Sequence, residues 1–233
     1  MPAIQAALPP RPGQLKVLFF DVNETLLDMS KLKKAVVAAF GDKSAYRQWF
    51  GLLLQYSLVA TVTEQYHEFS VIGNAAPDMS ATKLRTKPLR ATKQEEILTL
   101  MSQLPPHPDV EKGLGLLLQA GYQLVAFTNS TKRVLDQQLR HAGIMGCFEQ
   151  GLSVDSLRRY KPHVAVYHEA ARRVGVRPNQ AALIAAHGWD IAGAQAAGLA
   201  TGFIARPGQE IYPLAAPPTF QGKTLPEIAR QLA

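Results

Sequence analysis

Three short apolar runs along the chain each end abruptly on polar side chains. Short buried runs of this kind are typical of parallel strands, and helical segments alternate with them in the second half of the chain. The pattern predicts a doubly wound α/β fold with a Rossmann-like parallel sheet, whose polar groups meet at the carboxyl edge. The runs and their polar ends are residues 17–20 with Asp21, residues 124–127 with Thr128 and Asn129, and residues 183–186 with His187.

The segment between the first two runs has a different periodicity. From about residue 29 to residue 104, apolar side chains recur every three or four positions, which predicts amphipathic helices with one buried face. Glu95 and Glu96 are expected in the first turn of the last helix, and residues 74–77 are expected to interrupt the pattern. The apolar rows are Leu32, Val36, Val37 and Phe40; Trp49, Leu52, Leu53, Tyr56, Val59 and Ala60; and Ile97, Leu98, Leu100 and Met101.

These periodicities divide the chain into three parts. Residues 15–30 and 105–233 are predicted to form a Rossmann-like core domain, and residues 31–104 a helical cap domain inserted after the first strand. Residues 1–14 lack both a basic start and a long apolar middle, so they are predicted to be a flexible tail and not a targeting signal.

Composition and charge exclude several classes of protein. The 233-residue chain has a single cysteine, Cys147, which cannot form an internal disulfide and favours a reducing, cytoplasmic location. No apolar run approaches the roughly 20 residues that span a bilayer, so no membrane association is expected. The formal net charge is +7, but the densest basic run has no interleaved aromatic side chains, which indicates a solvated face or linker and no nucleic-acid site. This run consists of Lys83, Arg85, Lys87, Arg90 and Lys93.

The polar groups at the strand ends include residues suited to covalent chemistry. Asp21 ends the first run, Thr25 follows four positions later, and the string D-x-x-x-T-L-x-D continues to Asp28. This string resembles the first motif of the haloacid dehalogenase superfamily, in which the leading Asp is a covalent nucleophile. Three further stretches resemble the other motifs of the family, namely Thr128-Asn129, Lys161-Pro162 with its charge-neutralising lysine, and residues 183–190.

The resemblance leaves two types of reaction open, and two positions distinguish them. Phosphatases of this superfamily have an acid two residues after the nucleophile and a metal-binding carboxylate in the fourth motif. This chain has Asn23 and Ala186 at those positions. The resemblance therefore favours an L-2-haloacid dehalogenase that hydrolyses its substrate through an aspartyl ester on Asp21, with no metal and no cofactor. A metal-dependent phosphatase and a catalytically silent binding member of the superfamily remain alternatives.

Further positions match the dehalogenase subfamily. Tyr167 stands six residues after Lys161, as in the pattern K-P-x-x-x-x-Y, and Trp189-Asp190 matches the end of the pattern S-x-N-x-W-D. The resemblance implies that Asp190 holds Lys161 or orders the loop. The substrate-binding residues that it implies are Thr128, Asn129, Tyr167 and Trp189.

Two departures from the subfamily occur near the nucleophile. In the pattern S-x-N-x-W-D, Ala185 replaces the Ser, and His187 replaces the Asn that helps to position the hydrolytic water. Glu24 stands where the subfamily usually has glycine. Because an imidazole accepts a proton near neutral pH, we predict a dyad in which Glu24 orients His187, and His187 deprotonates the water that hydrolyses the Asp21 ester. The alternative is a structurally satisfied histidine beside a solvated glutamate.

The predicted cap departs from the subfamily as well. Dehalogenases of this type have Trp-Arg with a tyrosine six residues after the arginine. This chain has Trp49-Phe50, and Tyr56 stands six residues after Phe50. Phe50 cannot form a charge-assisted contact to a substrate carboxylate or a halide. Either Arg47, on nearly the same helical face, or an apolar halide cradle at Phe50 is expected in its place. The expected partner is a small halogenated carboxylic acid, and the resemblance implies a homodimer.

Overall fold

The computed structural model describes residues 14–233, so the tail predicted over residues 1–14 lies, except for Gln14, outside the described residues. At its centre is a six-stranded sheet in the order β3-β2-β1-β4-β5-β6, in which every neighbouring pair is parallel. The predicted doubly wound α/β fold is confirmed. The strands are β1 Val17–Phe20, β2 Gln123–Thr128, β3 Gln150–Ser153, β4 Ala181–Ala185, β5 Ala200–Ile204 and β6 Phe220–Gly222.

The chain changes direction across the sheet at its centre. From β1 it passes to β2 and β3 on one side, and from β4 to β5 and β6 on the other, so β1 and β4 flank the topological switch point. The carboxyl ends of strands at such a point are where open α/β sheets bind ligands. Asp21 directly follows β1 and His187 comes two residues after β4, so both lie at this point.

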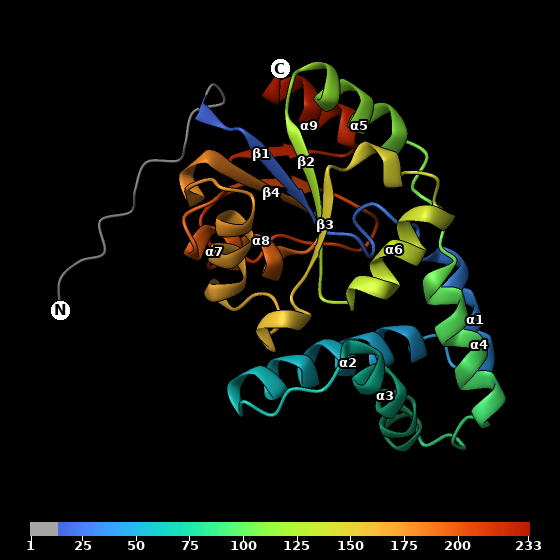
Figure 1. Ribbon diagram of the computed structural model, residues 1–233. Coiled ribbons are helices and arrows are strands. Elements are labelled where there is room, and N and C mark those ends of the chain that lie inside the picture. Colours follow the sequence, from blue (N-terminus) through green and yellow to red (C-terminus); the bar gives the residue numbers. More distant parts are fainter. Residues whose placement is uncertain (1–13) are drawn as a thin grey trace.

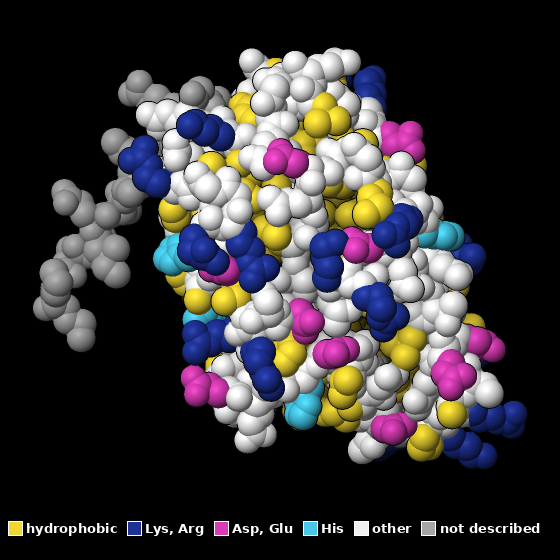
Figure 2. Space-filling view, in the orientation of Figure 1, with side chains coloured by type: hydrophobic (Ala, Val, Ile, Leu, Met, Phe, Trp, Pro, Cys, Tyr) yellow, Lys and Arg dark blue, Asp and Glu magenta, His cyan; other side chains and the backbone are white. Residues whose placement is uncertain are grey.

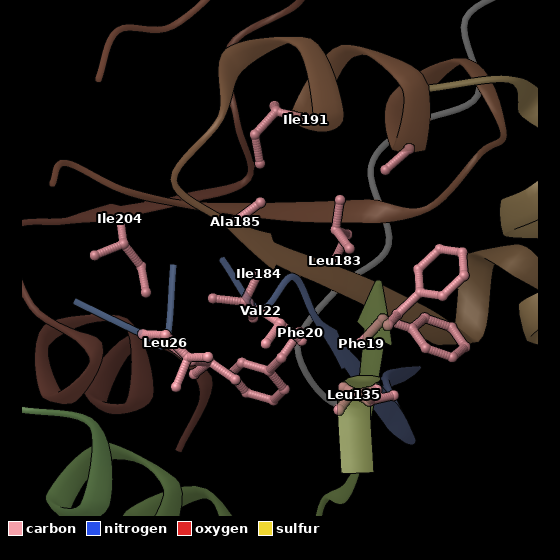
Figure 3. Packing of buried hydrophobic residues seen from close by; sticks show 14 of the residues in the cluster. Phe19, Phe20, Val22, Leu26, Leu135, Leu183, Ile184, Ala185, Ile191 and Ile204 are labelled. Atoms are coloured by element: carbon pink, nitrogen blue, oxygen red, sulfur yellow. The ribbon is translucent and has the colours of Figure 1, made fainter. Parts of the chain in front are cut away.

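Helices cover both faces of the sheet. Figure 1 shows α5 and α9 side by side on one face and α7 and α8 together on the other. β1 and β4 are completely apolar and buried, as expected for central parallel strands, and Figure 3 shows Phe20 and Ile184 in the packed interior near Leu26 and Ile204. The helices of this part are α5 Val110–Gln119, α6 Lys132–His141, α7 Val164–Arg173, α8 Gly188–Ala196 and α9 Leu225–Leu232.

A helical insertion follows β1, as the sequence pattern predicted. Its helices are α1 Ser30–Phe40, α2 Ala45–Val62, α3 Phe69–Leu84 and α4 Ala91–Ser102. Figure 1 shows α2 and α3 beyond the carboxyl ends of β1 and β2, with α4 beside α1. The segment that enters this insertion and the segment that leaves it are hydrogen-bonded to each other, because the Asp28 N–H donates to the Pro105 carbonyl at 2.8 Å.

The break predicted at residues 74–77 is wrong, because α3 continues through Pro77. A proline inside a helix removes the hydrogen bond to the carbonyl four residues earlier, here that of Gly73. The indole N–H of Trp49 on α2 donates to this same carbonyl at 3.3 Å. The packing of α2 on α3 therefore supplies the donor that Pro77 lacks, which periodicity within one segment cannot reveal.

Two other expectations for the insertion have different outcomes. Glu95 and Glu96 were expected in the first turn of a helix, but α4 already begins at Ala91, so this prediction is wrong by one turn. The basic run from Lys83 to Lys93 is exposed around the connection between α3 and α4, as predicted. Figure 2 shows Lys and Arg side chains interspersed with Asp and Glu on the face in view. Within residues 14–233, none of the helices has both the length and the apolar character needed to cross a membrane.

Candidate active site

The carboxylate of Asp21 is the centre of a buried network at the end of β1. Its Oδ1 accepts from Lys161 Nζ at 2.8 Å, and its Oδ2 accepts from Thr25 Oγ1 at 2.7 Å. The Nδ1 of His187 lies 3.0 Å from the same Oδ2. Burial alone raises the pKa of Asp21, but the charges and hydrogen bonds of Lys161 and His187 outweigh it and hold the pKa well below its usual range. Asp21 is therefore ionised at neutral pH.

Lys161 is fully buried, and each of its ammonium protons has an acceptor. Besides Asp21, Nζ donates to Asp190 Oδ2 at 2.7 Å and to the Phe127 carbonyl at 3.1 Å. Burial lowers the pKa of Lys161, but the two carboxylates outweigh it and raise that pKa above its ordinary value. The lysine is thus a fixed cation beside the predicted nucleophile.

Residues of the second and fourth motifs, Asn129 and Asp190, position this lysine. The other oxygen of Asp190 accepts from the hydroxyl of Tyr167 at 2.5 Å, and burial raises the pKa of Asp190. Asn129 accepts from the backbone N–H of Lys161 at 2.9 Å, and Thr128 closes a short turn by accepting from the Ser130 N–H. Tyr167, predicted to bind substrate, therefore has its hydroxyl committed to Asp190.

Both ring nitrogens of His187 face carboxylates. Its Nδ1 lies near Asp21, and its Nε2 lies 2.8 Å from Glu24 Oε2. Glu24 also accepts from the hydroxyl of Tyr46 on α2 and from the amide of Gln209, each at 2.9 Å. Burial lowers the pKa of His187, but the bonds and charges of Asp21 and Glu24 raise it to about 10. The structure brings the two predicted members of the dyad into contact with each other and with the predicted nucleophile.

The backbone at Glu24 explains why a glycine would fit there. Its φ of 61° lies in the left-handed region, which an L side chain adopts at a cost of about 1–2 kcal/mol. The turn from β1 needs this conformation, and the carboxylate reaches His187 from it. The residue with this costly backbone conformation is therefore the one that contacts His187.

Two aromatic rings stack near the imidazole of His187. Phe50 stacks at 6.4 Å between ring centroids and Trp189 at 5.1 Å. Tyr46 in turn stacks on Phe50, with centroids 5.7 Å apart and planes 6° apart. The side chain of Arg47 is exposed and has no hydrogen-bond or ion-pair partner among residues 14–233. The structure therefore brings Phe50 to the predicted site and leaves Arg47 outside it.

The sequence is similar to a known protein family over most of its length. Residues 15–198 match the model of the haloacid dehalogenase-like hydrolases. The chain belongs to this family. It is 28% identical to an (S)-2-haloacid dehalogenase of Burkholderia cepacia over 94% of this chain and 95% of the relative. It is 26% identical to a haloacetate dehalogenase of a Moraxella species over 94% and 99%. The predicted resemblance to the hydrolases that cleave carbon–halide bonds is confirmed.

Solved structures give the same fold for this haloacid dehalogenase-like hydrolase. The L-2-haloacid dehalogenase of Xanthobacter autotrophicus with chloropropionic acid covalently bound superposes with a TM-score of 0.84. The identity is 22%, with 93% of this chain and 97% of the other covered, so this match supports the fold alone.

A metal ion does not fit the donors at the site of this family member. Both oxygens of Asp21 and both of Asp190 already accept hydrogen bonds from cations or hydroxyls. The amide oxygen of Asn23 accepts from Gln138 at 3.0 Å, and Ala186 offers only a methyl group. No cluster of three or more potential ligands of the His, Cys, Asp or Glu type occurs in the described part of the chain. These donors suit fixed charges and not the oxygen-rich shell that Mg²⁺ requires.

Sequence reasoning missed a buried arginine that fixes the loop after β1. Arg206 donates to the Thr25 carbonyl at 3.0 and 3.1 Å and to Asp109 Oδ1 at 2.7 Å. Asp109 also accepts from the N–H of Leu225, the first residue of α9. These partners are far apart in the chain and belong to no motif, so no local pattern marks them. Tyr46, His107 and Gln209, which contact Glu24, were missed for the same reason.

Proposed function

We propose that the protein hydrolyses small 2-halogenated carboxylic acids through an ester on Asp21. The observation that carries the proposal is the position of Asp21, an ionised carboxylate at the switch point between Lys161 and His187. The relatives named as haloacid and haloacetate dehalogenases support the same substrate class.

In the first half-reaction, a carboxylate oxygen of Asp21 attacks the carbon that carries the halogen. The new carbon–oxygen bond forms as the carbon–halogen bond breaks, and the electron pair leaves with the halide. A halide is a stable anion, so this step needs neither a proton donor nor a metal ion. Lys161 stays paired with Asp190 while Asp21 loses its charge, which keeps the buried ammonium compensated.

In the second half-reaction, His187 accepts a proton from a water molecule that attacks the carbonyl carbon of the ester. The ester collapses to the 2-hydroxy acid and the Asp21 carboxylate. Glu24 holds the imidazole through Nε2, so Nδ1 faces the reacting group. Thr25 donates to the same oxygen of Asp21 that His187 faces and so helps to keep the carboxyl group in place.

The substrate contacts follow from which polar groups remain free. Lys161 has no spare proton, and the proposal assigns the substrate carboxylate to Asn129 and the adjoining backbone near Thr128. The rings of Phe50 and Trp189 supply an apolar surface next to His187, which suits the carbon chain and the halogen. Tyr167 acts by positioning Asp190.

The test is halide release from a panel of 2-halogenated acids, measured with and without EDTA, with phosphate esters as the second panel. We expect halide release that EDTA does not reduce and mass-spectrometric detection of an adduct on Asp21. Asp21→Asn should lower turnover by at least about 10⁴-fold while the melting temperature changes little. A strict Mg²⁺ requirement with phosphate release would establish a phosphatase. No adduct with either panel would indicate a binding protein.

Three further proposals concern organisation. We propose that residues 31–104 form a cap domain on a core of residues 15–30 and 105–233, because the bond between Asp28 and Pro105 joins the two segments that connect the cap to the core.

We propose a homodimer, supported by exposed apolar side chains of α2 and α3 such as Val59, Val62 and Val71. Light scattering tests the oligomeric state, and limited proteolysis tests the domain boundary. A cytoplasmic location remains a proposal from the lone, unpaired Cys147.

A further inference from the structure

His187 has a carboxylate oxygen within hydrogen-bond distance of each ring nitrogen. Nδ1 lies 3.0 Å from Asp21 Oδ2, and Nε2 lies 2.8 Å from Glu24 Oε2. A neutral imidazole carries one N–H and one lone pair, so it would point that lone pair at a carboxylate. Only the imidazolium donates to both oxygens. The resting enzyme therefore holds His187 protonated, in the form that cannot accept a proton from water.

We propose that His187 releases its Nδ1 proton when Asp21 is alkylated, so that the proton of the overall reaction leaves with the halide and before ester hydrolysis. This inference rests on the proposed function. It assigns Tyr46 and Gln209 as positioning residues that determine, through Glu24, which ring nitrogen loses the proton.

Alkylation changes one neighbour of the imidazolium and leaves the other unchanged. Asp21 becomes a neutral ester, whose oxygens are weak acceptors for the Nδ1 proton. Glu24 still faces Nε2, and hydrogen bonds from Tyr46 and Gln209 reach both of its oxygens. Because Glu24 accepts from both of these donors, it also acts as an acceptor toward His187. It therefore favours the tautomer with the proton on Nε2. The Nδ1 proton is the one that leaves, and the lone pair that remains faces the ester.

The protons and charges then balance over one cycle. The starting site has an Asp21 carboxylate and a His187 imidazolium. Alkylation releases halide, and the ring then loses a proton to solvent, which leaves the ester beside a neutral imidazole. Water gives one proton to Nδ1 and its hydroxyl to the ester carbon, which yields the hydroxy acid and restores both starting charges. The sum is one haloacid and one water converted to one hydroxy acid, one halide and one proton.

In the resting site, the two ring nitrogens of His187 face these two carboxylates. The rings of Phe50 and Trp189 stack near the imidazole and offer it no polar group. Lys161 and Asp190 lie beyond Asp21, while His107 and Arg206 contact the backbone of Glu24 and Thr25. The two carboxylates also raise the pKa of His187 to about 10 in the resting site, in agreement with the geometry.

The resting state is tested first by ¹⁵N NMR of the histidine-labelled protein at pH 8. An ordinary histidine is neutral at this pH, since its pKa is about 6.5. We expect one imidazolium, with both ring nitrogens protonated, whose signals are absent from His187→Asn. A neutral ring at His187 would overturn the proposal, whatever the enzyme does with haloacids.

The timing is tested by single turnovers with 2-chloropropionate and excess enzyme in weak buffer with a pH indicator. The temperature is lowered until halide release precedes 2-hydroxypropionate formation. We expect one proton per halide, released with the halide. In His187→Asn, halide should appear as a burst without a proton, and the proton should follow with slow hydrolysis.

Proton release that follows the hydroxy acid in the unaltered enzyme would overturn the inference, as would a proton burst in the variant. Either result would leave the proposed ester on Asp21 unaffected, because mass spectrometry detects that adduct independently of proton release. No halide and no adduct would instead contradict the proposed function itself.

Discussion

The two oxygens of Asp21 have neighbours of opposite character. On the Oδ1 side, Lys161 is surrounded by acceptors and is 0% exposed in its side chain, so its charge is fixed. On the Oδ2 side, His187 lies between Asp21 and Glu24 and belongs to the residue type that titrates most readily. In the proposed cycle, Lys161 keeps its charge throughout, whereas His187 changes its charge between the two steps.

The largest expected effect comes from removing the fixed cation. Lys161→Met keeps much of the side-chain volume but leaves Asp21 and Asp190 buried without their shared partner. We expect a loss of about 3–5 kcal/mol in the free energy of unfolding, measured by urea denaturation at pH 7. Lys132→Met is the matched control, because Lys132 forms an exposed pair with Asp136. Equal losses in the two variants would mean that the Oδ1 side does not carry the stability assigned to it.

The next effect concerns the second half-reaction alone. His187→Asn should leave alkylation of Asp21 intact and slow ester hydrolysis by roughly 10²–10⁴-fold, the usual range for a general base. The adduct should accumulate in the mass spectrum, with one equivalent of halide released per site. Glu24→Gln should give a milder version, because the imidazole remains. If the His187 variant turned over at the rate of the parent enzyme, His187 would not be the group that changes its charge, and the distinction between the Oδ1 and Oδ2 sides of Asp21 would be lost.

The pH dependence of stability separates the two sides further. The pKa of folded His187 is raised from 6.5 to about 10, so its contribution to stability is fully present below about pH 6.5 and is lost as the pH rises through about 10. The difference in unfolding free energy between the parent and His187→Asn should therefore shrink between those values. Urea titrations at pH 6, 8 and 10 measure it. A difference that grows with pH would mean that the histidine is neutral in the fold.

The smallest effect is expected at the hydroxyl that holds Glu24. Tyr46→Phe retains the ring stacked on Phe50 and removes one hydrogen bond, which corresponds to about threefold to tenfold slower hydrolysis. Alkylation and KM should stay unchanged, as single-turnover kinetics can show. Tyr122→Phe is the control, since that hydroxyl donates to the Leu232 carbonyl away from the site. Equal slowing of both half-reactions would assign Tyr46 a merely structural role.

The parts of the site that could be predicted are those with a local signal. Asp21 and His187 each follow an apolar strand, and the strand ends determine where they lie. Glu24 and His187 come from different loops, yet the resemblance to one family placed both beside the nucleophile. Their contact at 2.8 Å agrees with that expectation.

The parts that could not be predicted depend on contacts between distant segments. Pro77 reads as a helix breaker until Trp49 of another helix supplies the missing donor. Arg47 and Phe50 lie on nearly one helical face in the sequence, but only Phe50 is buried against His187. Gln209 lies 185 residues from its partner Glu24, a separation at which no periodicity is informative.

The connection from Arg206 to Asp109 and Leu225 has a consequence for synthesis on the ribosome. The loop that carries Thr25 is synthesised well before α9, but its anchor through Arg206 and Asp109 ends on the first residue of that helix. Domains of this kind fold as cooperative units while the chain is still growing. A nascent chain that lacks α9 would therefore already contain every residue assigned to catalysis and still lack the N–H that holds Asp109, the partner of Arg206.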